Sequence, residues 1–170
     1  QLIQQTLGVE TSNTRIQMLN FGYVANRIGE DASVSNLSTQ IASNLKRNSD
    51  GRRQDAQRFR LELDGNYLLP LDRKWDVYLR GAAAYSPDKL PDSEKYSIGG
   101  PGSVRAYRVS ELRGDSGAQA TLEFRRSLVL ASMPGSVSFF GDSGRVVYKA
   151  PGFADGWQSI SAWGAGISVY

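Results

Sequence analysis

The most constraining feature of this sequence is the strict alternation of apolar and polar side chains over residues 59–67. One phase holds Phe59, Leu61, Leu63, Gly65 and Tyr67, and the other holds Arg60, Glu62, Asp64 and Asn66. A β-strand sorts such a pattern onto two opposite faces, whereas a helix would scatter the charges around its axis. The segment is therefore predicted to be a strand with one apolar face and one polar face.

A second segment repeats this pattern and predicts a hairpin. Residues 75–85 alternate in the same way and follow a turn sequence, Leu71-Asp72-Arg73. Less regular versions recur at residues 3–9, 14–28, 37–45, 119–125, 137–142 and 160–170. The pattern changes phase within residues 14–28, which predicts a β-bulge there. The chain is therefore expected to be all-β and antiparallel, with about eight strands and no helix.

The connections between these segments alternate in length. Short turns are predicted at residues 29–31, 71–73 and 132–135, and longer polar loops at residues 46–55, 87–116 and 151–157. Transmembrane β-barrels of the outer membrane have this habit, with short turns on one side and long loops on the other. In such a barrel the polar face lines the lumen and the apolar face meets lipid. Aromatic side chains near the segment ends then mark the membrane interfaces, namely Tyr67, Trp75, Tyr85 and Tyr170.

A soluble β-sandwich or soluble β-barrel binding module is the alternative reading of the same alternation. One buried face gives nearly the same pattern as one lipid-facing face, so alternation alone leaves both open. The predicted strand length of about 10 to 12 residues favours the membrane barrel, because soluble strands usually have about 5 to 6. Solubility without detergent would distinguish the two.

Composition argues against enzymes and against nucleic-acid binding. The chain contains no cysteine and no histidine, which excludes a Ser-His-Asp triad, a thiolate nucleophile and a zinc site built on imidazole or thiolate. An outer-membrane protease or lipase is therefore not expected, although Gly-Asp-Ser-Gly occurs twice, at residues 114–117 and 141–144. The net charge of +3 is too small to indicate a nucleic-acid partner. No cofactor, metal or nucleotide is expected.

The long loop at residues 87–116 carries the most specific motif. About 30 residues without predicted secondary structure are unusual in a compact domain and are commonly functional. The loop contains glycines at Gly99, Gly100 and Gly102, followed by Val104-Arg105-Ala106-Tyr107 and then by Gly114-Asp115. This stretch resembles the loop of two-partner secretion (TpsB) outer-membrane transporters, of the haemolysin and filamentous-haemagglutinin secretion type. These belong to the BamA-like superfamily of POTRA-linked barrels. Their motif has Gly where this chain has Ala106.

A second motif strengthens the resemblance. The segment Phe139-Phe140-Gly141-Asp142-Ser143-Gly144 resembles the family's Asp-x-Gly strand motif, here Asp142 and Gly144. The resemblance implies that the loop folds back into the barrel and that its arginine, Arg105, pairs with Asp142 on the lumen wall. The alternation agrees, because it places Asp142 in the polar phase. An arginine can hold a carboxylate through two parallel hydrogen bonds.

The resemblance also implies a location and a function. It predicts a bacterial outer-membrane pore that translocates an unfolded exoprotein of the haemolysin or adhesin type without nucleotide. Its partners would be the secreted protein and the lipid bilayer. Such transporters have sixteen strands and POTRA domains, so residues 1–170 are expected to be part of the barrel domain, with no POTRA domain. A small closed barrel is the alternative, because eight strands are enough to close one. The barrel of a related outer-membrane assembly protein or autotransporter-type protein is the alternative within the fold.

Overall fold

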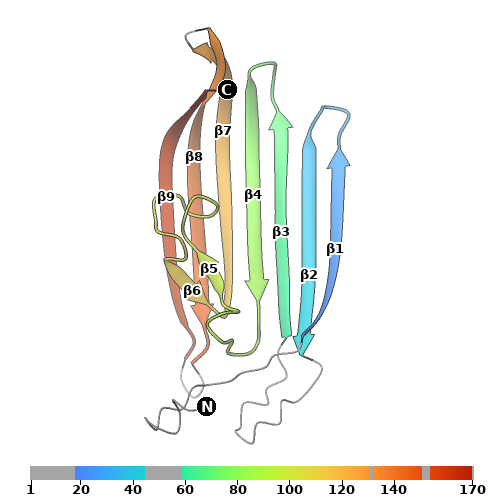
Figure 1. Ribbon diagram of the computed structural model, residues 1–170, viewed down its shortest axis with the longest axis vertical. Coiled ribbons are helices and arrows are strands. Elements are labelled where there is room, and N and C mark those ends of the chain that lie inside the picture. Colours follow the sequence, from blue (N-terminus) through green and yellow to red (C-terminus); the bar gives the residue numbers. More distant parts are fainter. Residues whose placement is uncertain (1–17, 45–58, 131, 151–153, 170) are drawn as a thin grey trace, which may run out of the picture.

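The structure, a computed structural model, describes residues 18–44, 59–130, 132–150 and 154–169. Seven long strands form one antiparallel sheet in the order β1-β2-β3-β4-β7-β8-β9, and a short hairpin, β5-β6, lies beside it (Figure 1). The strands are β1 (Met18–Ile28), β2 (Val34–Asn44), β3 (Phe59–Pro70), β4 (Trp75–Tyr85), β5 (Tyr96–Ile98), β6 (Leu112–Gly114), β7 (Ser116–Leu130), β8 (Met133–Tyr148) and β9 (Gly156–Val169). A helix able to cross a bilayer is absent from these ranges.

The predicted all-β, antiparallel fold is confirmed by these strands. The strand predicted at residues 3–9, the loop at residues 46–55, residues 151–153 and Tyr170 lie outside the described residues. Those predictions stay untested.

The strand register carries the two faces of β3 across the whole sheet. Leu63 lies opposite Ala83 of β4 and Thr39 of β2, while Asp64 lies opposite Ala82 and Ser38. Residues directly opposite each other in an antiparallel pair point to the same side. The side chains of the apolar face include Leu19, Phe21, Tyr23, Leu37, Ile41, Leu61, Leu63, Val77, Leu79, Leu122, Phe124, Val137, Phe139, Trp163 and Ile167. Those of the polar face include Gln40, Arg60, Glu62, Asp64, Arg80, Gln119, Thr121, Glu123 and Asp142.

The apolar face is open rather than packed against a second layer. Phe21 is 73% exposed, Ile167 72% and Trp163 90%. An exposed apolar surface that runs across seven strands is far larger than soluble monomeric proteins show. This sheet therefore needs an apolar surrounding on one side.

The short turns and the long β4–β7 loop lie at opposite ends of the sheet, as predicted. The β1–β2, β3–β4 and β7–β8 turns gather at the upper end in Figure 1, and the long β4–β7 connection leaves from the lower end. Asp72 stabilises the β3–β4 turn by accepting hydrogen bonds from the backbone N–H groups of Lys74 and Trp75, at 2.6 and 2.9 Å. These bonds lower the pKa of the Asp72 carboxyl.

Three local predictions are wrong. β1 pairs with β2 residue for residue from Met18 to Ile28, so the described part of residues 14–28 contains no bulge. Leu19, Phe21 and Tyr23 stay in one phase along β1, and Val24, 65% exposed, adds an apolar side chain to the opposite, polar face. Pro134, predicted to lie in a turn, is in β8 opposite Val129, because β7 and β8 stay paired as far as Leu130 and Met133.

The third wrong prediction concerns the long loop, which contains the hairpin β5-β6. Gly99 and Gly100 directly follow β5, and their φ angles of 109° and 95° let the chain turn there. A Cβ at Gly99 would lie 2.4 Å from the carbonyl oxygen of Arg108. The two glycines therefore serve the loop's own fold.

Candidate functional site

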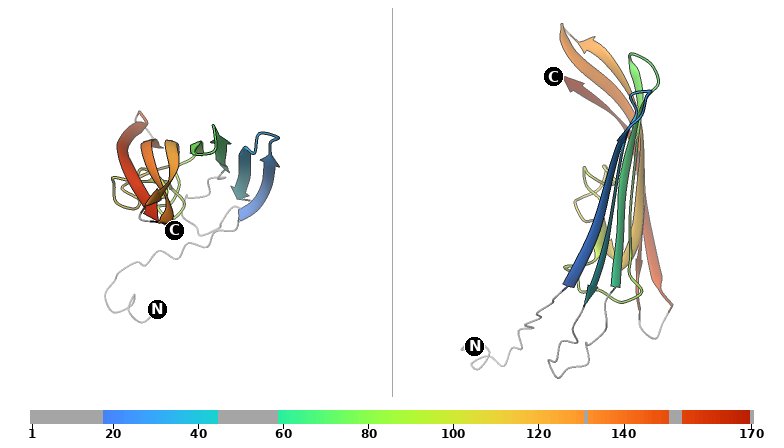
Figure 2. Two further views of the ribbon diagram at one scale, coloured as in Figure 1. Left: turned by 90° about the horizontal axis from the view of Figure 1, so that it is seen from above. Right: turned by 90° about the vertical axis from the view of Figure 1, so that its right-hand side faces the viewer.

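The β4–β7 loop, residues 86–115, packs on the polar face. Figure 2 shows it lying along one side of the curved sheet. Ile98 and Val104 from the loop are fully buried, as is Val146 of β8. Gly144 makes room for them, because a Cβ there would lie 3.0 Å from Ile98 Cδ1 and 3.3 Å from Val104 Cγ2. A small apolar core thus attaches the loop to β8.

Arg105 forms the strongest polar contact between loop and sheet. Its Nε donates to Asp142 Oδ2 at 2.8 Å and its Nη2 donates to Oδ1 at 2.9 Å. Its backbone N–H donates to Oδ2 at 3.1 Å. The Asp142 side chain is 0% exposed. The structure thus brings together the two residues that the sequence analysis paired, in a bidentate geometry that lysine could not reproduce.

Glu123 of β7 is a second acidic partner that the sequence analysis did not name. Its Oε2 accepts from Arg105 Nη1 at 2.6 Å, and its Oε1 accepts from Arg125 Nε at 2.8 Å. The Arg105 guanidinium also lies 3.4 Å from the centre of the Phe140 ring. We call Arg105, Glu123 and Asp142 the latch.

The charges in and around the latch balance. The carboxylates of Glu123 and Asp142 face the guanidinium groups of Arg105 and Arg125. The hydrogen bonds to Asp142, followed by those to Glu123, raise the pKa of Arg105 further above its ordinary value. Arg105 therefore stays charged, and the paired charges make burial of the Asp142 carboxylate tolerable.

The other motif residues surround the latch. Val104 is buried, Ala106 is exposed, and the Tyr107 hydroxyl donates to the carbonyl of Ser161 on β9 at 3.4 Å. Gly102 offers its carbonyl to Arg80 Nη1 at 2.7 Å. The motif therefore contacts both β4 and β9, although its central contact is on β8.

The base of the loop has its own anchor. The Asp115 side chain, 1% exposed, accepts the N–H of Leu90 and the N–H of Lys149, each at 2.6 Å. One carboxylate thus joins the start of the loop to the end of β8. The Ser116 hydroxyl adds two bonds to the backbone of Ser86, at 3.0 and 3.1 Å.

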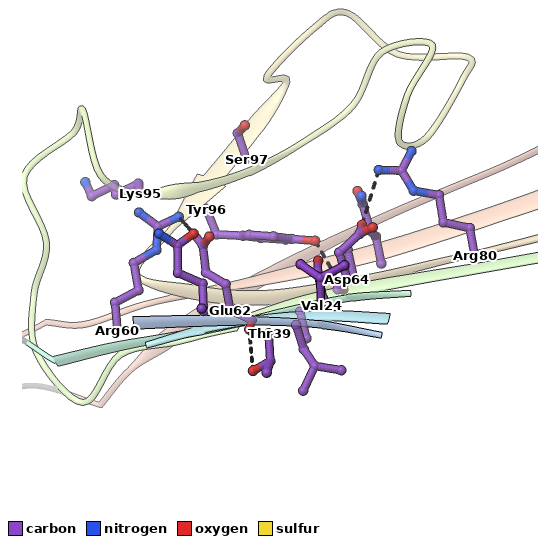
Figure 3. A pocket seen from close by; sticks show the side chains of 16 residues that line it. Val24, Thr39, Arg60, Glu62, Asp64, Arg80, Lys95, Tyr96 and Ser97 are labelled. Atoms are coloured by element: carbon purple, nitrogen blue, oxygen red, sulfur yellow. Dashed lines mark hydrogen bonds and ion pairs between the residues drawn. The ribbon is translucent and has the colours of Figure 1, made fainter. Parts of the chain in front are cut away.

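A polar groove lies between the loop and the first half of the sheet. It has a volume of about 460 Å³. In Figure 3, Arg60, Glu62, Asp64 and Arg80 rise from the sheet toward Lys95, Tyr96 and Ser97 of the loop. Arg60 pairs with Glu62, and Arg80 pairs with Asp64 at 3.3 Å.

Tyr96 forms part of the loop side of this groove. Burial, followed by the charge of Asp64, raises the pKa of Tyr96 to about 12. The hydroxyl is therefore neutral and donates to the carbonyl of Ala82 at 3.2 Å.

Among the described residues, no group of three or more acidic side chains lies close enough together to hold a metal ion. The charged groups of the groove and of the latch are paired with each other or with loop residues, whereas Asp76 Oδ1 on β4 is buried without a hydrogen-bond partner in the part of the chain that the structure describes. What the site offers is a polar wall, an anchored loop and an open groove beside it.

Comparison with known proteins identifies the family. A search of curated proteins gave no match. Residues 4–169, nearly the whole chain, match the family described as haemolysin secretion/activation protein ShlB/FhaC/HecB. The two motifs, the antiparallel sheet and the exposed apolar face agree with this match. The chain therefore belongs to the ShlB/FhaC/HecB family, which consists of outer-membrane β-barrel transporters for two-partner secretion in Gram-negative bacteria, not of enzymes.

Proposed function

We propose that residues 1–170 are part of a sixteen-stranded barrel domain whose lumen contains the β4–β7 loop. Both ends of the described sheet, β1 and β9, have a neighbour on one side only. Unpaired strand edges are unfavourable inside a membrane, and closure of the sheet removes them. In this arrangement the apolar face meets lipid and the polar face, with the loop, turns inward.

The pore passes an unfolded exoprotein of the haemolysin or adhesin type across the outer membrane without nucleotide. The observation that carries this proposal is the latch, which holds a long loop on the polar face beside an open polar groove. An extended polypeptide needs hydrogen-bonding partners for its backbone along its route. Paired charges of both signs on the groove wall offer such partners, and they do not hold positively or negatively charged segments of the exoprotein selectively.

The latch sets the position of the loop within the pore. With the latch closed, the loop occupies the half of the wall formed by β7 and β8, and the groove on the other half stays open. The loop therefore both supports the wall and limits the width of the passage. Residues Val104, Arg105, Ala106 and Tyr107 act as its anchor, and Asp142 and Gly144 act as the receiving site.

The test is secretion by the full-length protein in proteoliposomes, with an unfolded exoprotein inside and no nucleotide present. We expect the exoprotein to become accessible to external protease, and Arg105→Ala to reduce this strongly. Arg108→Ala is the matched control, since Arg108 is an exposed arginine of the same loop. Membrane insertion of other barrels without exoprotein release would instead indicate an assembly protein, and strict nucleotide dependence would contradict the proposed mechanism.

A further inference from the structure

An apolar groove lies on the apolar face at the loop end of the sheet. It has a volume of about 470 Å³, which is within the range of about 300–1,000 Å³ usual for small-ligand sites. Ala83 of β4 and Ala118 of β7 lie opposite each other within it. Leu63 and Tyr85 line it from one side and Val147 from the other. Small side chains next to large ones thus create a hollow at this end of the face.

A single arginine lies at this hollow. Arg145 of β8 is directly opposite Ala118 and also lines the groove. It is exposed, and its guanidinium lies 4.2 Å from the centre of the Trp157 ring. Among the described residues of the apolar face, the register places three charged side chains, Arg27, Arg126 and Arg145, and no carboxylate. Arg145 therefore lacks an acidic partner on this face.

The position of Arg145 matches a membrane interface. A second arginine–tryptophan pair, Arg126 with Trp75 at 5.3 Å, lies at the turn end. Along β7, Ala118 opposite Arg145 and Arg126 are separated by eight residues, which is about 26 Å along the strand and about 20 Å of height at the 35–45° tilt of such strands. The apolar band of outer-membrane barrels is about 25 Å tall and is bordered by aromatic residues. The two pairs thus lie just inside the two borders of the band, from where long arginine side chains reach the headgroups, and the Arg145 pair adjoins the groove.

We propose that this groove binds lipid A, the phosphorylated lipid of the outer leaflet, with an acyl chain over Ala83 and Ala118 and a phosphate on Arg145. The proposal rests on the proposed function, which places the apolar face in lipid. Outer-membrane barrels carry their long loops outside the cell, so the loop end of the sheet, with Arg145, faces the outer leaflet. The unpartnered guanidinium selects an anionic headgroup because arginine holds phosphate through two parallel bonds. Stacking on Trp157 keeps it at the border, where the headgroup lies.

The test counts lipid A molecules that stay bound to the purified full-length protein in native mass spectrometry after detergent exchange. We expect one retained lipid A per wild-type chain. Arg145→Gln should lower retention at least about tenfold through loss of charged hydrogen bonds. Ala118→Phe should lower it as well by filling the hollow. A heat-dependent shift in gel mobility verifies that each variant is folded.

The matched controls lie on the same face. Arg126→Gln removes the arginine of the other arginine–tryptophan pair, and Ala120→Phe adds the same ring one position outside the groove. Both should retain lipid A like the wild type. The proposal would be overturned if the controls lost as much lipid A as Arg145→Gln, or if Arg145→Gln lost none. It would also be overturned if equimolar phosphatidylglycerol displaced lipid A, or if the protein dimerised through the groove without lipid. A wild type that secretes exoprotein but retains no lipid A refutes the lipid site alone, and one that retains lipid A but fails to secrete refutes the proposed function alone.

Discussion

Arg105→Ala should open the loop far more often than any other single change in the latch. The substitution leaves Asp142, whose side chain is fully buried, with the backbone N–H of residue 105 and the Thr121 hydroxyl but without two charged donors. Removing one partner of a buried ion pair costs about 3–5 kcal/mol. Glu123 reduces this cost little, because it keeps its hydrogen bond to Arg125. We therefore expect about 3 kcal/mol, which is more than a hundredfold in the loop-opening equilibrium.

The other two latch residues should matter less, in a definite order. Asp142→Ala leaves Arg105, whose side chain is 25% exposed, bonded to Glu123, so a loss of about 2 kcal/mol is expected. Glu123→Ala leaves the bidentate pair intact and should cost about 1 kcal/mol. The double variant of Arg105 and Asp142 should be little worse than Arg105→Ala alone, a coupling of about 2 kcal/mol.

The assay uses the absence of cysteine from the sequence. Val104 is fully buried beside the latch, so a Val104→Cys thiol is accessible only when the loop opens. Its alkylation rate in the membrane-embedded full-length protein then reports the open population. Additive effects of the two substitutions, or an alkylation rate that Arg105→Ala leaves unchanged, would refute the reasoning.

Three further changes probe other parts of the structure. Gly144→Val should displace the loop and speed alkylation of Val104→Cys, while Gly141→Val, with open space around its Cβ position, should not; equal effects would contradict the packing account. Asp115→Asn leaves one of two buried N–H groups without an acceptor, at about 1–3 kcal/mol, so proteolysis within the loop should accelerate, and an unchanged cleavage rate would exclude this anchor. Leu63→Arg should impair membrane assembly by about 2–4 kcal/mol, measured by heat-modifiable mobility, and more than Asp64→Arg; the reverse order would invert the assigned faces.

The sheet was predictable because the alternation of apolar and polar residues that defines each strand is a local feature of the sequence. Alternation fixes the two faces of each strand, so the sequence alone places Asp142 and Asp64 on the polar side. The β1 strand shows the limit of this reasoning. Its apolar residues occur in both phases, and only the residue-by-residue pairing with β2 shows that no bulge separates them. Pairing depends on a neighbour that the local pattern does not contain.

The site was predictable only in part for the same reason. The motifs single out Arg105 and Asp142, which the structure brings together. Glu123 joins them because Thr121 lies opposite Asp142, so that Glu123 lies opposite Phe140, whose ring stacks on Arg105. The sequence did contain a signal for Glu123. It lies in the polar phase of its strand, and that strand forms a hairpin with the strand that carries Asp142. The extent of the β7–β8 pairing, which includes Pro134, and the β5-β6 hairpin both depend on tertiary pairing. The sequence contains no comparable signal for either.

The most direct test of the central claim is the environment of neighbouring residues on β3 in a bilayer. Nitroxide labels are placed singly at positions 61–66 of the full-length protein, reconstituted in outer-membrane lipid. We expect strict alternation, with lipid-dissolved oxygen relaxing the spin labels at Leu61 and Leu63 and a water-soluble nickel complex relaxing those at Glu62 and Asp64. Labels that are all accessible to the nickel complex would contradict the assignment of the apolar face to lipid and of the polar face, with its latched loop, to a pore.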